Sequence, residues 1–272
     1  MQGSSCSRLA TRTGARGAVA ALVVAVAVLG LAQPGQAIIN GTPDGNGHPY
    51  VGAVDVRPTG RQIPGSGVLV SPTVFVTAGH VARFFTDAGL TQASVTFDPV
   101  FDGNNGTFFT GDIHINPLYT GQINDQHDMA VIVFAEPIEG IVPADLPTEN
   151  FLGGLHPQLL RSETYPAVGY GISRVFGGND GGGQPGIDRS SAGTRRAGTW
   201  SFVSLSRDWI RFDMGEQQGC VGDSGAPNFL GNSSLVVGIG ISGDFACEHM
   251  GSDIRVDTPA TRAFLSDFVD LP

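Results

Sequence analysis

The sequence predicts an all-β fold that ends in one short helix. After the first 37 residues, the apolar segments are short and rich in Val, Phe, Ile, Thr and Trp, and they are separated by Gly, Pro, Asn and Asp. That pattern is typical of a β-sandwich or β-barrel. The segment 259–269 differs, because Phe264, Leu265 and Phe268 share a helical face and Thr258 can cap the helix.

The strand pattern recurs along most of the chain. It covers segments at 50–56, 65–71, 73–79, 93–98, 129–135, 165–171, 199–205, 209–214 and 234–242. A proline-rich polar stretch at 135–151 separates two β-rich halves, and the glycine-rich stretch 176–188 has the composition of a surface loop. The length suits either one large all-β unit or two barrels of roughly 100–120 residues each.

The first 37 residues have the composition of an export signal. Arg8, Arg12 and Arg16 precede an apolar run at 18–32, and the segment contains no acidic residue. The run is shorter than the ~20 residues that a membrane-spanning helix needs, and small residues follow it. We therefore expect a cleaved signal peptide at 1–37 rather than a membrane anchor, and a mature protein that is secreted and extracellular.

The mature chain is strongly acidic. All 15 basic residues are arginine and three of them lie in the signal segment, so 12 arginines face 25 acidic residues, a formal charge of −13. Such a surface repels nucleic acids and anionic membranes, and we expect neither as a partner. His114, His127 and His249 lack metal-ligand spacing, so we expect no metal, and no motif indicates a cofactor.

Two cysteines, Cys220 and Cys247, remain beyond the signal segment. In an exported chain, two cysteines most simply form one disulfide. A free thiol that acts as a nucleophile is the alternative.

Three separated residues indicate nucleophilic catalysis when they are taken together. His80 follows an apolar strand, Asp128 precedes another, and Ser224 lies in the glycine-rich loop "GCVGDSGAP". A serine hydroxyl is almost unreactive until an imidazole removes its proton, and the imidazole needs a carboxylate to orient it. Glycines beside the serine let backbone N–H groups converge on a developing oxyanion.

The motifs around these residues resemble those of the chymotrypsin-like (trypsin-fold) serine proteases, in the family's order of His, Asp and Ser. "TAGH" resembles the histidine motif, "HDMAVIVF" the aspartate motif and "GDSGAP" the serine motif. "AVGYG" at 167–171 resembles the Gly-aromatic-Gly turn of the second barrel, and "IING" at 38–41 resembles the mature N-terminus. The resemblance covers the whole mature chain. It implies two six-stranded antiparallel Greek-key barrels, at 38–147 and 148–272, with the short C-terminal helix.

The resemblance also implies a role for each motif residue. His80 is the general base, Asp128 orients it, and Ser224 is the nucleophile that forms an acyl-enzyme. The backbone N–H groups of Gly222 and Ser224 form the oxyanion hole. A disulfide joins Cys220 to Cys247 beside the specificity pocket.

Asp223 is expected to pair with the amine of Ile38 once the signal is removed. The alternative for Asp223 is a solvated turn. The alternative for the N-terminus is a start at Gln33, which would leave a five-residue pro-segment.

The resemblance places the specificity pocket at Gln218, Gly219, Ser242, Gly243 and Gly251. Gln218 occupies the position of the pocket base, and because it is uncharged we expect a neutral or mixed substrate preference. Asp244 and Asp253 lie close in sequence and are alternative sources of negative charge. We expect Ser242 to support Asp128, with Ile241 as the alternative at that position.

Three residues depart from the family's pattern. Val81 stands where the family has a cysteine, Gly79 where alanine is common, and Ala226 where a second glycine is common.

The sequence as a whole predicts a secreted serine endopeptidase that acts on protein or peptide substrates as a monomer. A catalytically silent relative that binds a protein or polysaccharide is one alternative. An esterase or a glutamate-specific relative with the same triad is another.

Overall fold

The computed structural model describes residues 38–101, 103, 105–122, 124–176, 186–243, 247 and 250–272, with the backbone alone for 242 and 243. All of them belong to one compact unit, residues 34–272. The predicted signal segment at 1–37 and most of the predicted loop at 176–188 lie outside the described residues.

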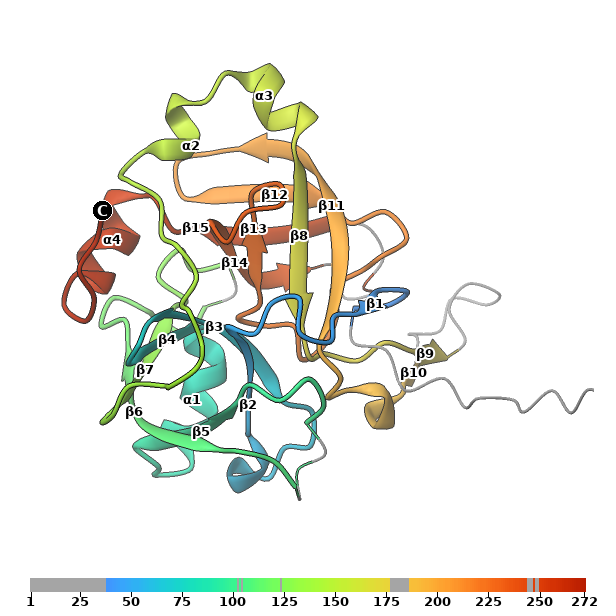
Figure 1. The fold of residues 1–272 in the computed structure, drawn as a ribbon, viewed down its shortest axis with the longest axis vertical. Helices are drawn as coiled ribbons and strands as arrows, with labels where there is room; N and C mark the ends of the chain where they lie inside the picture. The colour runs from blue at the N-terminus through green and yellow to red at the C-terminus, as the bar shows by residue number, and fades with distance from the viewer. Residues whose placement is uncertain are drawn as a thin grey trace, which may run out of the picture. The chain divides into compact units, whose positions relative to one another are not determined.

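The first half of this unit is a closed six-stranded antiparallel barrel (Figure 1). Its interior is filled by alternate apolar side chains, among which Leu69, Phe75 and Ile132 are almost completely buried. Antiparallel strands alternate their side chains between two faces, so each strand contributes every second residue to this core. In barrel order the strands are β2 (Val51–Val54), β3 (Gly65–Ser71), β4 (Val74–Thr77), β7 (Ala130–Phe134), β6 (Phe109–Ile115) and β5 (Gln92–Thr96).

The second half is a larger antiparallel sheet that also closes on itself, because β8 pairs with both β11 and β13. The short strand β1 (Thr42–Pro43) extends its edge at β11, and the two-residue strands β9 (Val175–Phe176) and β10 (Gly186–Ile187) form a separate pair. The six strands of the closed ring are β8 (Thr164–Gly169), β11 (Arg196–Leu205), β12 (Trp209–Asp213), β15 (Met250–Arg255), β14 (Val236–Gly243) and β13 (Pro227–Phe229).

Short helices lie at the edges of the barrels. They are α1 (Gly79–Asp87), α2 (Phe151–Gly154), α3 (Pro157–Ser162), α4 (Pro259–Leu265) and two 3₁₀ turns at Arg57–Thr59 and Arg189–Ser191. None of the helices in the described part of the chain is long and apolar enough to cross a membrane.

The predicted C-terminal helix is confirmed as α4. The Thr258 hydroxyl accepts a hydrogen bond from the Thr261 N–H at 3.2 Å, which is the expected N-cap. The helix ends at Leu265, four residues before the predicted end, and Phe268 folds back onto Phe264 in an edge-to-face contact. The apolar face continues through this turn although the helix does not.

The predicted fold class is confirmed, but the sequence patterns did not find every strand. All nine predicted segments overlap strands, whereas the two-residue strands β1, β9 and β10 and the longer strands β6, β13 and β15 were not predicted. β15 has the sequence "MGSDIR", and its Asp253 is buried. A polar residue at an interior position breaks the alternation on which strand prediction depends.

Two polar side chains from the second half of the chain anchor it to the first barrel. The Tyr170 hydroxyl donates a hydrogen bond to the Asp98 carbonyl at 2.8 Å. The Arg195 guanidinium, 1% exposed, donates to the carbonyls of Val51 and Phe97, both at 3.0 Å. Buried backbone carbonyls need donors, so these side chains fix one barrel against the other.

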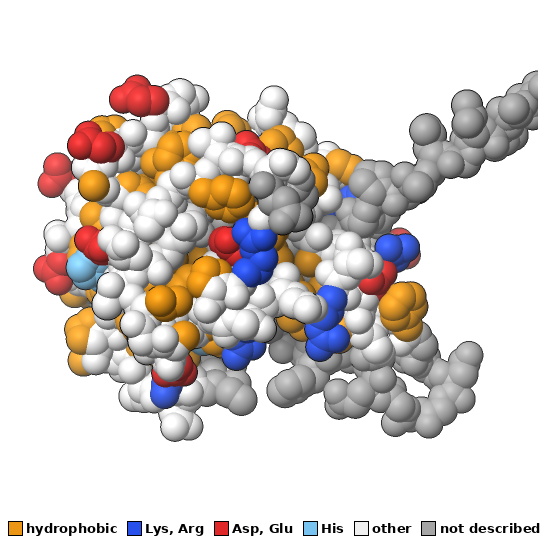
Figure 2. Space-filling view, turned by 90° about the horizontal axis from the view of Figure 1, so that it is seen from below, with side chains coloured by type: hydrophobic (Ala, Val, Ile, Leu, Met, Phe, Trp, Pro, Cys, Tyr) orange, Lys and Arg blue, Asp and Glu red, His pale blue; other side chains and the backbone are white. Residues whose placement is uncertain are grey.

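The arginine side chains on the face drawn in Figure 2 lie apart from one another and do not form a continuous basic patch.

Candidate active site

His80 and Asp128 meet at the point where β4 and β7 lie side by side. His80 is the second residue of α1, which starts directly after β4, and Asp128 directly precedes Met129 and β7. The Nδ1 atom of His80 lies 2.8 Å from Oδ2 of Asp128, and the His80 backbone N–H donates to Oδ1 at 2.7 Å. The Asp128 carboxylate is 3% exposed and uses both oxygens to hold one histidine.

Gly79 is explained by this contact. A Cβ atom on Gly79 would lie 3.0 Å from Oδ1 of Asp128 and 3.0 Å from the Met129 nitrogen. Because position 79 is glycine and not the alanine that is common in the family, the backbone after β4 packs directly on the Asp128 carboxylate.

Ser224 lies in the loop between β12 and β13, and it shares one cavity with His80 and Asp128. The cavity has a volume of about 510 Å³. The backbone carbonyl of Ser224 accepts a hydrogen bond from the Ser66 N–H at 2.9 Å, which ties this loop to β3 of the first barrel. Among the described residues, the Ser224 hydroxyl has no hydrogen-bond partner, so it remains available inside the cavity.

The backbone around Ser224 leaves two N–H groups unused. Neither the Gly222 N–H nor the Ser224 N–H donates a hydrogen bond to any residue in the described ranges. Gly222 has a φ of +99°, and a Cβ there would lie 2.6 Å from the Ile63 side chain and 2.7 Å from the Gly171 backbone. Only glycine fits this conformation and this close approach.

The Asp223 side chain turns away from the cavity mouth into the protein. It accepts hydrogen bonds from the N–H groups of Gly171 and Cys220, both at 2.9 Å, and from the N–H of Ile38, which is fully buried. Burial raises the pKa of Asp223 to about 7, and these hydrogen bonds oppose the rise.

The Gly169-Tyr170-Gly171 turn is explained by the same carboxylate. A Cβ atom on Gly171 would lie 2.5 Å from Oδ2 of Asp223, and a Cβ on Gly169 would overlap Oδ1. The glycines that suggested a turn in the sequence are therefore the walls of the Asp223 site.

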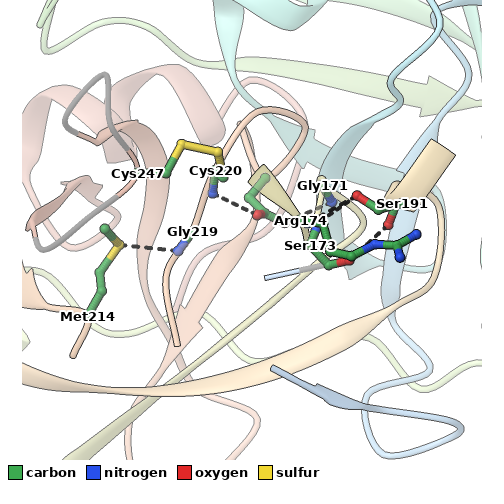
Figure 3. The surroundings of a disulfide bond; sticks show 9 residues. Gly171, Ser173, Arg174, Ser191, Met214, Gly219, Cys220 and Cys247 are labelled. Carbon is green, nitrogen blue, oxygen red and sulfur yellow. Dashed lines mark hydrogen bonds between the residues drawn. A yellow bond between two sulfur atoms is a disulfide. The ribbon is translucent and has the colours of Figure 1, made fainter. Parts of the chain in front are cut away.

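The predicted disulfide between Cys220 and Cys247 is confirmed, and it joins two cysteines that are 27 residues apart in the sequence. Figure 3 shows it beside Gly219, whose N–H points at the Met214 sulfur at 3.3 Å. The bridge therefore ties the Ser224 loop to the segment that follows β14.

The residues predicted for the specificity pocket divide into three groups. Gly219 and Gly251 line the cavity. Gln218 does not line it, because its amide donates a hydrogen bond to the Gly215 carbonyl at 3.1 Å. Ser242 and Gly243 lie at the end of β14, where the structure describes the backbone alone.

Ile241, the alternative to Ser242, lines the cavity with an exposure of 8%. The support of Asp128 by Ser242 stays a prediction.

Val81, at the position of the missing cysteine, is buried at 2% exposure. It packs so closely on the first barrel that a Cβ on Gly65 would lie 2.6 Å from its Cγ1 atom. Apolar packing occupies the place where relatives have a disulfide.

Trp200, Met214 and Asp253 are among the cavity residues that were not in the predicted pocket. Trp200 was read only as part of a strand pattern, and Met214 as the end of another. Asp253 was considered only for its closeness in sequence. Their meeting depends on the pairing of β12 with β11 and β15, which no local pattern reveals.

Comparisons with known proteins agree with this geometry. The family model described as Trypsin matches residues 38–265. No curated protein matches the chain. The solved structure described as "HL collagenase structure at 1.7 Å resolution" superimposes with a TM-score of 0.63 at 18% sequence identity, and the match covers 85% of this chain and 98% of that one. At 18% identity the superposition shows only that the two proteins share a fold. The family model matches most of the sequence, so it shows the family. The chain belongs to the trypsin family of serine endopeptidases.

Proposed function

We propose that the protein is a secreted serine endopeptidase that cleaves peptide bonds through an acyl-enzyme on Ser224. The observation that carries the proposal is the His80–Asp128 pair at the edge of the cavity that also contains the Ser224 hydroxyl, which has no hydrogen-bond partner among the described residues. The His80 side chain is 26% exposed, so its ring is open to that cavity.

The arrangement supports a complete acyl transfer. Because Asp128 engages Nδ1 of His80, Nε2 is the atom left to take the Ser224 proton as Oγ attacks the substrate carbonyl carbon. The tetrahedral intermediate then collapses, the peptide C–N bond breaks, and the leaving amine takes the proton from Nε2. Water repeats the sequence on the ester and releases the acid.

The negative charge of the intermediate needs donors that are unoccupied beforehand. The N–H groups of Gly222 and Ser224 meet this requirement, since they flank Asp223 and donate to no described residue. Such preorganised donors stabilise the oxyanion without reorganising at the moment of reaction.

Ile38 is the N-terminus that we propose for the active form. Its φ of +50° is strained for a β-branched residue, and its N–H already donates to the buried Asp223. Cleavage before Ile38 removes the φ constraint and turns the N–H into an ammonium, which forms an ion pair with Asp223. Removal of the predicted signal peptide during export would produce this terminus directly.

The test uses a fluorophosphonate probe on protein purified after export. Intact mass is measured for the wild type, for Ser224→Ala, and for the control Ser201→Ala, which changes an exposed serine of β11. We expect one probe on the wild type and the control, none on Ser224→Ala, and a wild-type mass that begins at Ile38.

Two outcomes would contradict the proposal. A folded protein that begins at Ile38 and is not labelled would point to a silent relative that binds rather than cleaves. A labelled protein that begins at Gln33 would refute the direct release of Ile38 while leaving the triad intact.

A further inference from the structure

A second cavity adjoins the active-site cavity at the reacting groups. Its volume is about 380 Å³, and His80, Val221 and Ser224 line both cavities. Gly219 and Gly251, which were predicted for the specificity pocket, line the first cavity alone. A peptide that places its acyl part in the first cavity therefore continues past Ser224 into the second, which we call the leaving-group cavity.

Two arginines from opposite halves of the chain line the leaving-group cavity. Arg61 lies between the 3₁₀ turn Arg57–Thr59 and β3, and Arg189 begins the 3₁₀ turn that follows β10. Both are exposed, and neither guanidinium forms a hydrogen bond or an ion pair with any described residue. No acidic side chain of the described residues lines this cavity, although the chain as a whole has 25 acidic residues and 15 basic ones.

The acidic residues closest in sequence to these arginines are paired with other cations. Asp55 accepts two hydrogen bonds from the Arg57 guanidinium, both of 2.7 Å. Asp188 pairs with Arg174 at 3.0 Å. The positive charges that line the leaving-group cavity are therefore not compensated by their neighbours in the chain.

The Arg61 guanidinium is placed by an aromatic contact. Its central carbon lies 3.4 Å from the centroid of the Phe84 ring, and Phe84 meets the His80 ring edge-on, with centroids 6.3 Å apart. A guanidinium stacked on a ring uses its face, so the N–H groups at its edge stay available to an anion. Arg61 is therefore a preorganised donor that only one side chain separates from His80.

The turn that carries Arg189 is also fixed. Ser191 is completely buried, and its hydroxyl donates to the Asp188 carbonyl at 2.6 Å. The same hydroxyl accepts hydrogen bonds from the N–H groups of Ser173 and Arg174, at 3.0 and 3.1 Å (Figure 3). Because the backbone of the turn is held, only the Arg189 side chain has to be ordered when an anion binds.

We propose that Arg61 and Arg189 bind a carboxylate of the substrate within the first two residues after the scissile bond. The inference rests on the proposed function and adds to it a preference on the leaving-group side. Arginine suits this task, because its planar guanidinium matches a carboxylate and stays charged at every pH at which the triad works. Ile63, Ile187 and Val221 give the cavity apolar walls, which lower the local dielectric constant and strengthen an ion pair.

A carboxylate at this position can come from two sources. An aspartate or glutamate side chain supplies it inside a longer chain, and the free C-terminus supplies it when only two residues follow the scissile bond. The first source makes the protein an endopeptidase that prefers acidic residues after the bond. The second favours the release of dipeptides from the end of a chain.

The experiment measures the leaving-group side alone, by acyl transfer. p-Nitrophenyl acetate acetylates Ser224 and releases p-nitrophenolate, and its small acyl group makes no demand on the first cavity. An added dipeptide then competes with water. Its α-amine attacks the ester carbonyl, the C–O bond to Ser224 breaks, and the amine proton passes through His80 to Oγ. The yield of acetyl-dipeptide per p-nitrophenolate released, measured by mass spectrometry and absorbance, reports how well the dipeptide binds in the leaving-group cavity.

Three matched pairs of dipeptides separate the sources of the carboxylate. Amides with glutamate or glutamine in the first position, followed by alanine, form one pair. Amides with glutamate or glutamine in the second position, after alanine, form another. Alanyl-alanine with a free C-terminus and alanyl-alanine amide form the third.

The variants remove the two charges singly and together, as Arg61→Gln and Arg189→Gln. Arg207→Gln is the matched control, because its side chain is 83% exposed and lines neither cavity. Ser224→Ala gives the background of direct reaction between the ester and the dipeptide. Labelling with the fluorophosphonate probe counts the active sites of every other protein.

We expect the wild type and the Arg207→Gln control to acetylate the acidic member of at least one pair roughly 5- to 10-fold better than its neutral member, an effect of the size that exposed ion pairs produce. Each single variant should reduce this ratio, and the double variant should bring it close to one while transfer to the neutral dipeptides stays unchanged. The wild-type ratio should also fall when NaCl is raised from about 0.02 M to about 0.5 M, because salt screens exposed charges.

The outcomes separate the inference from the function beneath it. A preference for glutamate identifies an acidic side chain as the ligand, a preference confined to the free C-terminus identifies the chain end, and both support the inference. Equal transfer within every pair by a labelled enzyme overturns it and leaves the endopeptidase intact. A preference that persists in the double variant, or that salt does not reduce, also overturns it. A protein that is not labelled and releases p-nitrophenolate no faster than Ser224→Ala overturns the proposed function, and the inference with it.

Discussion

At the scale of single residues, the site is built by carboxylates whose environments differ sharply. Asp128 accepts two hydrogen bonds from His80 beside the cavity, whereas burial raises the pKa values of Asp223 and Asp253 to about 7. In the proposed mechanism the first orients the base and the second supports the loop that carries Ser224, and the third faces the cavity. One residue type performs three tasks because burial and hydrogen bonding set its charge.

Replacing Asp128 by asparagine tests the first of these tasks. Asparagine keeps the shape but cannot accept from both His80 donors and hold the Nδ1–H tautomer, so kcat should fall by roughly 10⁴-fold, the magnitude known for characterised members of this family. KM for the same peptide should change little, since Asp128 does not contact the peptide side chains. An unchanged kcat would show that His80 is not the base.

The pH dependence of stability tests the buried acids. The pKa values of Asp223 and Asp253 are about 7, against ~4 in the unfolded chain, so the folded state binds protons more tightly between these values. The free energy of unfolding should therefore fall as the pH rises from about 4 to about 7. Asp44 and Asp125, whose pKa values are lowered, act in the opposite direction at a pH below this window.

Urea unfolding across this pH range provides the measurement, in a Ser224→Ala background that prevents self-digestion. A form that begins at Ile38 should lose less stability with rising pH than a form that retains Ala37, because the ammonium of Ile38 keeps Asp223 ionised. Identical pH profiles for the two forms would refute the pairing of Ile38 with Asp223.

At the scale of elements, glycines decide how closely strands and loops approach. Gly67 on β3 lies so near the Phe75 ring and the Val76 carbonyl of β4 that any Cβ would overlap them. Gly154, in α2, has nothing within 4 Å of the same position.

Gly67→Ala and Gly154→Ala form a matched pair. We expect Gly67→Ala to destabilise the fold by about 1–3 kcal/mol or more, because it overpacks the first barrel. Gly154→Ala should be neutral or slightly stabilising, since it only restricts the unfolded chain. The midpoints of urea unfolding give the comparison, and an equal effect of both substitutions would contradict the packing argument.

At the scale of the whole molecule, the two barrels are joined by buried polar contacts as well as by apolar packing. Arg195, which directly precedes β11, pairs with Asp44 at 3.0 Å and donates to carbonyls of the first barrel. The Ser66 N–H of β3 also bonds to the Ser224 carbonyl at 2.9 Å, so the position of Ser224 depends on both barrels.

Removal of the Arg195 charge should weaken this connection. Arg195→Met removes one donor from Asp44, which keeps its hydrogen bonds to His48, and takes a donor from three backbone carbonyls, so it should cost roughly 3–5 kcal/mol. Arg207→Met, at a side chain that is 83% exposed, should change stability by less than about 0.5 kcal/mol. Thermal unfolding distinguishes the two, and a neutral Arg195→Met would show that the barrels do not depend on this anchor.

The sequence by itself determined the fold class, the C-terminal helix, the disulfide partners and the family, because short β-patterned segments, a helical face, two cysteines and the motifs around His80, Asp128 and Ser224 are local signals. Tertiary structure alone decided which groups line the cavity. It turned Gln218 outward and brought Asp253 inward from β15, a strand whose alternation is broken by that buried acid. The lining of the cavity was hidden from the sequence because it depends on strand pairing across the second barrel, where residues far apart in the chain share one wall.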